Sequence, residues 1–283
     1  MVIHWYPGHM TKTRRMMEDS LKLVDALCEV VDARIPISSR NPDIAVLAAN
    51  LPKMIVLNRC DQADPNATAK WRNYFASQGY IVIETDCKSG AGTKAFGNAV
   101  RELLKDKIAR SAAKGQTKTL RLMIAGIPNV GKSSLINRLS GKKSTKTEDR
   151  PGVTRGKQWI TLQGGIELLD TPGILWPKID DEQAALHLVF TGAVKDDVLD
   201  IQELACELIK KLTEVKPSAL SGRYNAEPTG DSYEDLQMFG RKRGFLISGG
   251  EVDCERMSKI LLDEYRGGKL GRITLELPEE VKE

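Results

Sequence analysis

The chain has 283 residues, enough for one large domain or two of ordinary size. Hydrophobic residues make up 41% of it and charged residues 28%, proportions that are ordinary for a soluble globular protein. The formal net charge of +4 permits a nucleic-acid partner but does not require one.

The cysteines and the lengths of the apolar segments indicate the cellular compartment of the protein. Five cysteines are dispersed without a CxxC pair, which argues against a disulfide framework or a zinc site: Cys28, Cys60, Cys87, Cys206 and Cys254. The N-terminus has no apolar stretch of signal-peptide length, and no segment of the chain approaches the roughly 20 apolar residues of a membrane span. We therefore expect a soluble, cytoplasmic protein with no membrane partner.

Short β-branched runs predict a parallel sheet in the first two thirds of the chain. These runs cover 27–33, 53–58, 80–85 and 120–126, and helical patterns alternate with them at 9–24, 42–50, 66–78, 92–111 and 132–140. Two further runs, 158–162 and 166–171, flank "QGG" and predict a hairpin. This alternation predicts an α/β sheet covered on both faces.

From about residue 181 the pattern becomes helical. Apolar residues recur at helical spacing over 181–190, 197–212, 232–244 and 252–268. We expect two domains, an α/β domain over 1–178 and a small all-helical domain over 179–283.

The stretch "GIPNVGKSS" at 126–134 fits the phosphate-loop pattern G-x-x-x-x-G-K-[ST] and lies between an apolar run and a helical one. Its glycines allow successive N–H groups to face a β-phosphate, while Lys132 supplies a positive charge and Ser133 a hydroxyl for Mg²⁺. The expected GTP-binding residues here are Asn129, Val130, Gly131, Lys132, Ser133 and Ser134.

Two later segments complete a phosphate site. In "LLDTPG" (168–173), Asp170 is placed to hold the magnesium and the Gly173 N–H to sense a γ-phosphate. Thr154, in the loop between, can ligate Mg²⁺ when GTP is bound. We expect Ser133, Thr154 and Asp170 at the metal, and catalytic contributions from Lys132, Thr154 and Gly173.

A loop suited to guanine lies early in the chain, at "NRCD" (58–61). The Asp61 carboxylate can accept hydrogen bonds from the N1–H and N2–H₂ of guanine, which adenine lacks, and Asn58 can tie this loop to the phosphate loop. Arg59 replaces the usual lysine and can lie over the purine. A second loop, "TDCKSG", offers backbone N–H groups to the guanine O6 from Cys87, Lys88 and Ser89.

The base loops come first in this chain, before the phosphate loop, Thr154 and "DTPG", whereas in Ras-like GTPases the base loops come last. Joining the end of the α/β region to its start would restore the usual order. The sequence therefore predicts a circularly permuted Ras-like P-loop GTPase domain, feasible because chain termini tend to lie close together at the surface.

Three stretches carry a family resemblance over essentially the whole chain. They are the opening "WYPGHMTKTRR", "NRCD" placed before "GIPNVGKSS", and the tail "GFLISGGEVD…LLDEYRGGKLGRITLE". In these the chain resembles the YlqF/RbgA family of ribosome-biogenesis GTPases. The resemblance implies a helical C-terminal domain likened to RNA-binding modules, and a role in late assembly of the large ribosomal subunit, with its rRNA and pre-50S particle as partner.

Catalysis has two open points. Ile174 occupies the position where Ras-like enzymes place a water-orienting glutamine, so a group from elsewhere is needed, and His9 is the candidate that the family resemblance also implies. Alternatively, His9 caps or packs on the first helix. Asn129 resembles the asparagine that helps to hold K⁺ in potassium-stimulated GTPases, or it is a simple loop residue.

The leading hypothesis is a GTPase that is slow alone and stimulated by the large ribosomal subunit, with GTP or GDP, Mg²⁺ and, through Asn129, K⁺ as ligands. Another P-loop ATPase or kinase, or an RNA-binding module with a structural nucleotide site, stays open; a tRNA-modifying GTPase is a distant option. Basic residues near the start, in 142–157 and at 241–243 permit an RNA surface. The oligomeric state is open, with a monomer as the expectation.

Overall fold

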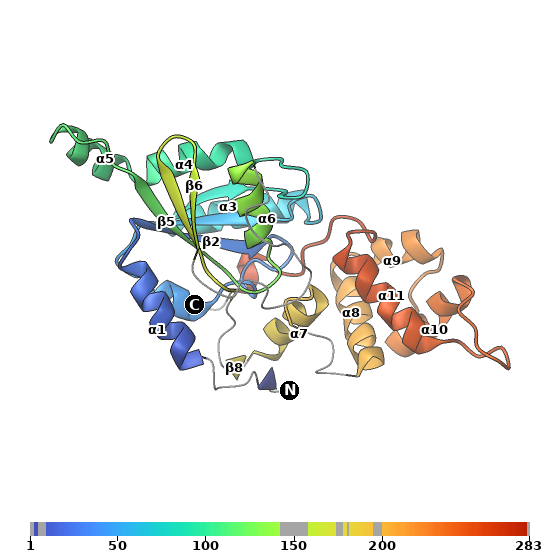
Figure 1. The fold of residues 1–283 in the computed structure, drawn as a ribbon. Coiled ribbons are helices and arrows are strands. Elements are labelled where there is room, and N and C mark those ends of the chain that lie inside the picture. Colours follow the sequence, from blue (N-terminus) through green and yellow to red (C-terminus); the bar gives the residue numbers. More distant parts are fainter. Residues whose placement is uncertain are drawn as a thin grey trace.

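The computed structural model describes residues 3–4, 10–141, 158–173, 178–179, 181–194 and 200–281 (Figure 1). Its main sheet has six strands in the order β4-β3-β2-β5-β7-β6. They are β2 (Ala26–Asp32), β3 (Lys53–Asn58), β4 (Ile81–Glu84), β5 (Leu120–Ala125), β6 (Gln158–Leu162) and β7 (Ile166–Asp170). Neighbouring strands are parallel except for β6, which pairs antiparallel with β7 as the predicted hairpin. A separate antiparallel pair joins β1 (Ile3–His4) to β8 (Lys178–Ile179).

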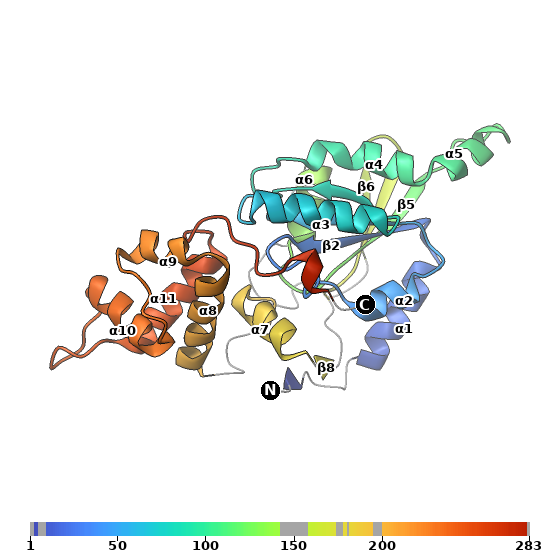
Figure 2. The same cartoon turned by 180° about the vertical axis from the view of Figure 1, so that it is seen from behind.

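Helices cover both faces of this sheet, because alternate residues of its buried strands point to opposite sides. Leu27 of β2 packs with α1 and α2, whereas its neighbour Cys28 packs with α4 and α6. Trp71 of α3 packs with Val31, which alternation along β2 places on the same side as Leu27. Figure 2 shows α3 in front of the strands. The helices are α1 (Met10–Leu21), α2 (Pro42–Leu47), α3 (Pro65–Ser77), α4 (Phe96–Leu103), α5 (Lys105–Ala112) and α6 (Lys132–Ser140).

The helix expected over 92–111 consists of three pieces. A 3₁₀ turn, η2 (Thr93–Ala95), leads into α4, and the backbone leaves helical geometry at Leu104 (φ −109°, ψ 17°) before α5 begins. Leu104 is buried, so its side chain anchors the point where α5 turns away from the body of the protein (Figure 1).

The sheet confirms the permuted fold. The base loops follow β3 and β4, and the phosphate loop follows β5, which comes later in the chain. Because these strands are parallel, their carboxyl ends lie at one edge of the sheet, and all three loops meet there.

Helices follow the sheet, as expected. They are α7 (Glu182–Phe190), α8 (Ile201–Val215), α9 (Pro217–Tyr224), α10 (Ser232–Lys242) and α11 (Cys254–Arg266). Aspartates at 181, 200, 231 and 253 cap α7, α8, α10 and α11 by accepting hydrogen bonds from first-turn amides. The sequence analysis missed α9, which Pro217 begins and Asn225, in a left-handed conformation, ends. None of the helices in the described ranges is both long and apolar enough to cross a membrane.

The last described residues return from α11 to the α/β part. The Ile273 amide donates to the Gln62 carbonyl and the Leu275 amide to the Arg34 carbonyl, each at 2.8 Å. The Trp71 indole Nε1 donates to the Glu276 carbonyl at 2.9 Å. The division at residue 178 stays a prediction, but the tail, ending in η4 (Pro278–Glu280), packs on the loops after β2 and β3.

A buried carboxylate fixes this tail. Glu276 accepts hydrogen bonds from the Ile37 amide at 2.7 Å and the Ser38 amide at 3.2 Å, and its Oε1 lies 2.9 Å from His187 Nδ1. Three segments, the loop after β2, α7 and the tail, are therefore held at one point.

Candidate functional site

The phosphate loop connects β5 to α6 and is built around three residues with positive φ. These are Gly126 (φ 147°), Asn129 (φ 59°) and Gly131 (φ 99°). A Cβ at Gly131 would lie 2.2 Å from Asn58 Nδ2, and one at Gly126 would lie 2.5 Å from the Val30 carbonyl oxygen. Glycine is thus required at both positions for the backbone to wrap tightly.

Lys132, the first residue of α6, is buried within this loop. Its Nζ donates to the carbonyls of Gly126 at 2.9 Å and Ile127 at 2.7 Å. Burial lowers the pKa of Lys132 to about 8, although Asp170 opposes the shift. Ser133 and Ser134 follow in the same turn and are half-buried.

Asp170 ends β7 and lies beside Ile124 of β5. It is completely buried, and among the described residues neither carboxylate oxygen has a hydrogen-bond partner. Burial raises the pKa of Asp170 to about 6, against the attraction of Lys132. A buried carboxylate without a partner is costly unless a ligand satisfies it.

These donors fit Mg²⁺. The ion takes one or two protein oxygens and fills its remaining positions with water and substrate phosphates, so the Asp170 carboxylate and Ser133 hydroxyl are a sufficient protein set. In the described ranges, no group of three or more His, Cys, Asp or Glu side chains could form an all-protein cage for a metal.

The base loop is joined to the phosphate loop by Asn58, the last residue of β3. Its Nδ2 donates to the Val130 carbonyl at 2.7 Å, and its Oδ1 accepts from the Cys87 amide at 3.1 Å and from Thr85 Oγ1 at 3.2 Å. One side chain therefore holds the phosphate loop and both base loops together.

Arg59 and Asp61 differ in their surroundings. Arg59 has a left-handed backbone (φ 63°), and its Nη2 donates to the Asn129 carbonyl at 3.0 Å. Asp61, two residues later, has an exposed side chain. The arginine thus braces the phosphate loop, while the aspartate faces solvent.

The second base loop is closed around Asp86. The Asp86 carboxylate accepts from the Lys88 amide at 2.8 Å and the Ser89 amide at 3.1 Å. Cys87 is buried, and burial raises the pKa of its thiol to about 11. The three amides of this loop are engaged in the structure, so their donation to guanine stays a prediction.

The "DTPG" turn packs on the phosphate loop. Thr171 Oγ1 donates to the Ile124 carbonyl at 2.9 Å. A Cβ at Gly173 would lie 2.8 Å from Lys132 Nζ and 2.9 Å from Pro128 Cα, so this position accepts only glycine. His9, Thr154 and Ile174 lie outside the described residues, and their roles stay predictions.

The comparisons with known proteins agree with this geometry. A family model described as "50S ribosome-binding GTPase" matches residues 121–220. The chain is 45% identical over 285 residues to ribosome biogenesis GTPase A of Bacillus cereus, covering 100% of this chain and 96% of that protein. It is 35% identical to the Thermotoga maritima protein of that name, covering 98% and 95%. The chain belongs to the ribosome biogenesis GTPase A (RbgA/YlqF) family.

Solved structures of the family have the same fold. GNP-bound YlqF from T. maritima matches with a TM-score of 0.66 at 31% identity, over 95% of this chain and all of that one. A GDP-bound structure of TM YlqF gives a TM-score of 0.68 at 31% identity, over 93% and 99%.

In this family member, a chain of polar contacts leads from the phosphate loop to the C-terminal helices. Arg59 Nε lies 3.5 Å from Asp32, which forms a buried pair with Arg34 (Nη2 to Oδ2, 2.7 Å). Arg34 Nη1 then approaches the carbonyls of Tyr265 and Arg266 at the end of α11, each at 3.4 Å. Burial acts to raise the pKa of Asp32, but Arg34 and Arg59 hold it below its ordinary value.

A second path closes this chain into a ring. Arg266 donates to the carbonyls of Val189 at 2.8 Å and Phe190 at 3.1 Å, at the end of α7. Just beyond, the Gly192 carbonyl accepts from Asn129 Nδ2 at 2.7 Å. The phosphate loop therefore contacts both α7 and, through Arg34, α11.

The sequence analysis missed the other members of this ring: Asp32, Arg34, Gly192 and Arg266. The acid and base at 32 and 34 directly after a buried strand were the available signal, since charged residues at the carboxyl end of a parallel strand belong to the site edge. The partners around 190 and 265 are too distant in sequence to be found by spacing.

Proposed function

We propose that this protein binds GTP with Mg²⁺, hydrolyses it to GDP and phosphate, and uses the cycle to bind and leave the large ribosomal subunit late in its assembly in the cytoplasm. The contact from Asn58 Nδ2 to the Val130 carbonyl carries the proposal, because it joins a guanine-type loop to a phosphate loop. The family membership supplies the ribosomal partner.

Guanine choice is assigned to Asp61, whose exposed carboxylate is free to accept from the base. Arg59 acts mainly on affinity, since its guanidinium braces the Asn129 carbonyl. Lys88 and Ser89 also have exposed side chains, and they border the base from the second loop.

Ser133 and Asp170 would hold Mg²⁺, with Thr154 as a third ligand. The ion supplies charge that neutralises the β- and γ-phosphates. Lys132 binds the same phosphates after exchanging the Gly126 and Ile127 carbonyls for them. His9 orients the attacking water. Asn129 takes part in holding K⁺ through its side-chain oxygen, whereas its Nδ2 is the atom that donates to the Gly192 carbonyl.

A movement of the Asn129 side chain on binding of nucleotide and K⁺ would make subunit binding depend on the nucleotide. When the Asn129 side chain leaves Gly192, the phosphate loop loses its direct hydrogen bond to the end of α7. The helical part then changes its position relative to the site, and with it the surface presented to rRNA.

Cosedimentation with large ribosomal subunits tests the proposal. We expect binding with a GTP analogue to exceed that with GDP or no nucleotide at least tenfold, and GTP turnover to rise when subunits are added. Equal binding in all three states would contradict a nucleotide-dependent switch, and ADP binding as tight as GDP binding would favour an ATPase or kinase.

The Asp61→Asn variant tests the choice of base. It should shift the nucleotide preference toward xanthine nucleotides, because the amide can donate to the xanthine O2.

A further inference from the structure

The helix α5 and the turn after it form a basic projection at the edge of the sheet opposite the nucleotide site. No residue of α5 is buried, and residues 112–119 are all exposed. Figure 1 shows α5 extending beyond α4 and the strands. Because a polar helix this short gains little stability alone, its extension into solvent suggests a surface kept for a partner.

The projection is strongly basic. Residues 105–118 contain five basic residues and one acidic residue, Lys105, Lys107, Arg110, Lys114 and Lys118 against Asp106. Their net charge of +4 equals that of the whole chain, and residues 142–157, with six basic residues against two acidic ones, carry another +4. The projection is therefore one of the strongly basic stretches of the chain.

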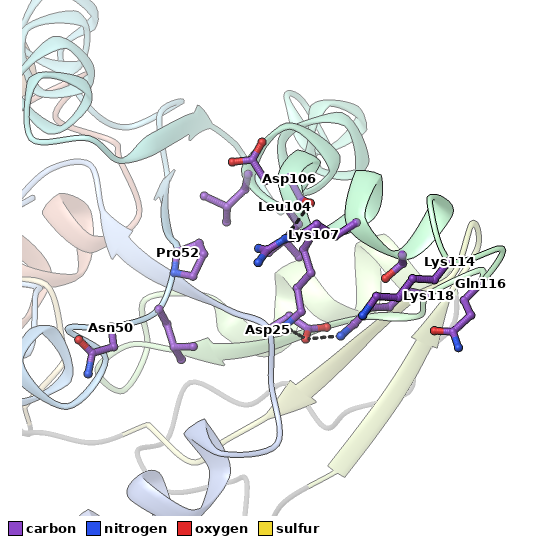
Figure 3. A pocket seen from close by; sticks show the side chains of 13 residues that line it. Asp25, Asn50, Pro52, Leu104, Asp106, Lys107, Lys114, Gln116 and Lys118 are labelled. Atoms are coloured by element: carbon purple, nitrogen blue, oxygen red, sulfur yellow. Dashed lines mark hydrogen bonds and ion pairs between the residues drawn. The ribbon is translucent and has the colours of Figure 1, made fainter.

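Beneath the projection lies a cavity of about 490 Å³ with Asp25 in its wall. Figure 3 shows Lys107 and Lys118 directed at this carboxylate, with Nζ–Oδ1 distances of 2.5 and 3.2 Å. The Arg121 amide donates to the other oxygen of Asp25 at 3.0 Å. One buried acid thus fixes two lysines at the mouth of the cavity.

Two further basic groups line the cavity without an acidic partner. In the described part of the chain, Arg110 donates only to the Asp106 carbonyl at 3.2 Å, and Lys114 forms no ion pair. After Asp25 and Asp106 are counted, the lining keeps a surplus of two positive charges.

We propose that this α5 surface, defined by Lys107, Arg110, Lys114 and Lys118, binds the phosphate backbone of rRNA. Point charges without an aromatic platform suit phosphates and carry no base sequence. The surface lies at the amino ends of β2 and β5, so it gives the protein an RNA contact on the side away from the phosphate loop. The choice of RNA over an acidic protein rests on the proposed function.

The test compares two double variants of equal charge loss. Arg110→Ala/Lys114→Ala removes the two groups without acidic partners among the described residues. Lys70→Ala/Arg72→Ala removes the same residue types from the exposed face of α3, where they pair with Glu279 and Glu84. Binding is measured with a naked rRNA transcript and with large subunits between 50 and 200 mM salt. For the α5 variant we expect about tenfold weaker binding and a salt slope smaller by about 1.5, because two phosphate contacts are lost.

The outcomes separate this inference from the proposed function. If the α5 variant binds the transcript like the wild type, or no worse than the α3 variant, the α5 surface is not an RNA contact. Polyglutamate serves as a third probe. If the α5 variant lost binding to polyglutamate but kept binding to the transcript, the surface would be assigned to an acidic protein and the proposal would be overturned. If the wild-type protein does not bind large subunits, the proposed function is wrong, while binding to the transcript still decides the role of the α5 surface.

Discussion

Two buried aspartates lie at opposite ends of the strands of one sheet, and both are near lysines, but they differ in their hydrogen bonds and in the direction of their pKa shifts. Asp170, at the carboxyl end of β7, faces Lys132 without a hydrogen bond, and its pKa is raised to about 6. Asp25, before β2, is bonded to Lys107, Lys118 and the Arg121 amide. Burial acts to raise its pKa too, but these partners hold the pKa below its ordinary value.

The difference teaches how to tell a structural carboxylate from a functional one. A satisfied buried acid stabilises the fold by itself, as at Asp25. An unsatisfied one destabilises the fold until a ligand arrives, as at Asp170, and such groups concentrate at functional sites.

The largest effect should follow from removing the charge of Asp170. In Asp170→Asn we expect the Mg²⁺-dependent part of GTP affinity to fall about 100-fold, since a metal contact contributes several kcal/mol. Calorimetric titration with GTP, in Mg²⁺ and in a chelator, measures it. Glu167→Gln, on the same strand but partly exposed beside Arg121, is the control and should bind like the wild type. An unchanged Mg²⁺ response in Asp170→Asn would refute the assignment.

Removing Asp25 should lower the stability of the protein without changing nucleotide binding. Asp25→Ala leaves two lysines facing each other and a backbone amide unpaired, at a cost of about 2 kcal/mol in the free energy of unfolding. Because the pKa of Asp25 is lowered on folding, this contribution is complete above about pH 4 and is lost as pH falls through the lowered value.

Urea unfolding at pH 7 measures this cost. The control Asp19→Ala removes an exposed aspartate that also pairs with a lysine, Lys22 at 3.1 Å, and should change stability by less than about 0.5 kcal/mol. Equal effects of the two substitutions would show that the burial of Asp25 does not matter.

The features that could be predicted from the sequence are those that depend on local patterns of residues. The spacing of "GIPNVGKSS" and the strand–helix alternation are local, and the permuted order of motifs followed from reading them along the chain. The break at Leu104 was missed because the residues around it favour a helix. The helix α9 was missed because Pro217 and Gly222 argue against one, although Pro217 at its first turn is compatible with helix.

The contacts that connect the site to the helical part lie beyond such reasoning. Arg34 meets the end of α11 more than 230 residues away, and the tail around Glu276 closes over loops near residue 37. No period or spacing encodes such pairs. The same holds for the cavity at Asp25. Lys107, near the start of α5, and Lys118, just before β5, converge there because the chain leaves and returns close to the start of β2.

The smallest expected effect is on the stability of Asp170→Asn without nucleotide or Mg²⁺. It tests most directly whether Asp170 differs from Asp25. The pKa of Asp170 rises from its ordinary 3.8 to about 6 on folding, so the folded protein disfavours the ionised form. The substitution should therefore stabilise the protein at pH 7.5, by at most about 3 kcal/mol, because the pKa of about 6 already includes the attraction of Lys132.

The pH dependence of this gain distinguishes it from a simple packing change. Below about pH 4 the carboxyl is protonated in both folded and unfolded chains, so no gain is expected; it grows between about pH 4 and 6 and is constant above. Thermal unfolding at pH 5 and pH 7.5 should thus show a larger rise in Tm at the higher pH. A fall in Tm at pH 7.5, as expected for Asp25→Ala, would mean that both aspartates are structural and that Asp170 is satisfied by the protein alone.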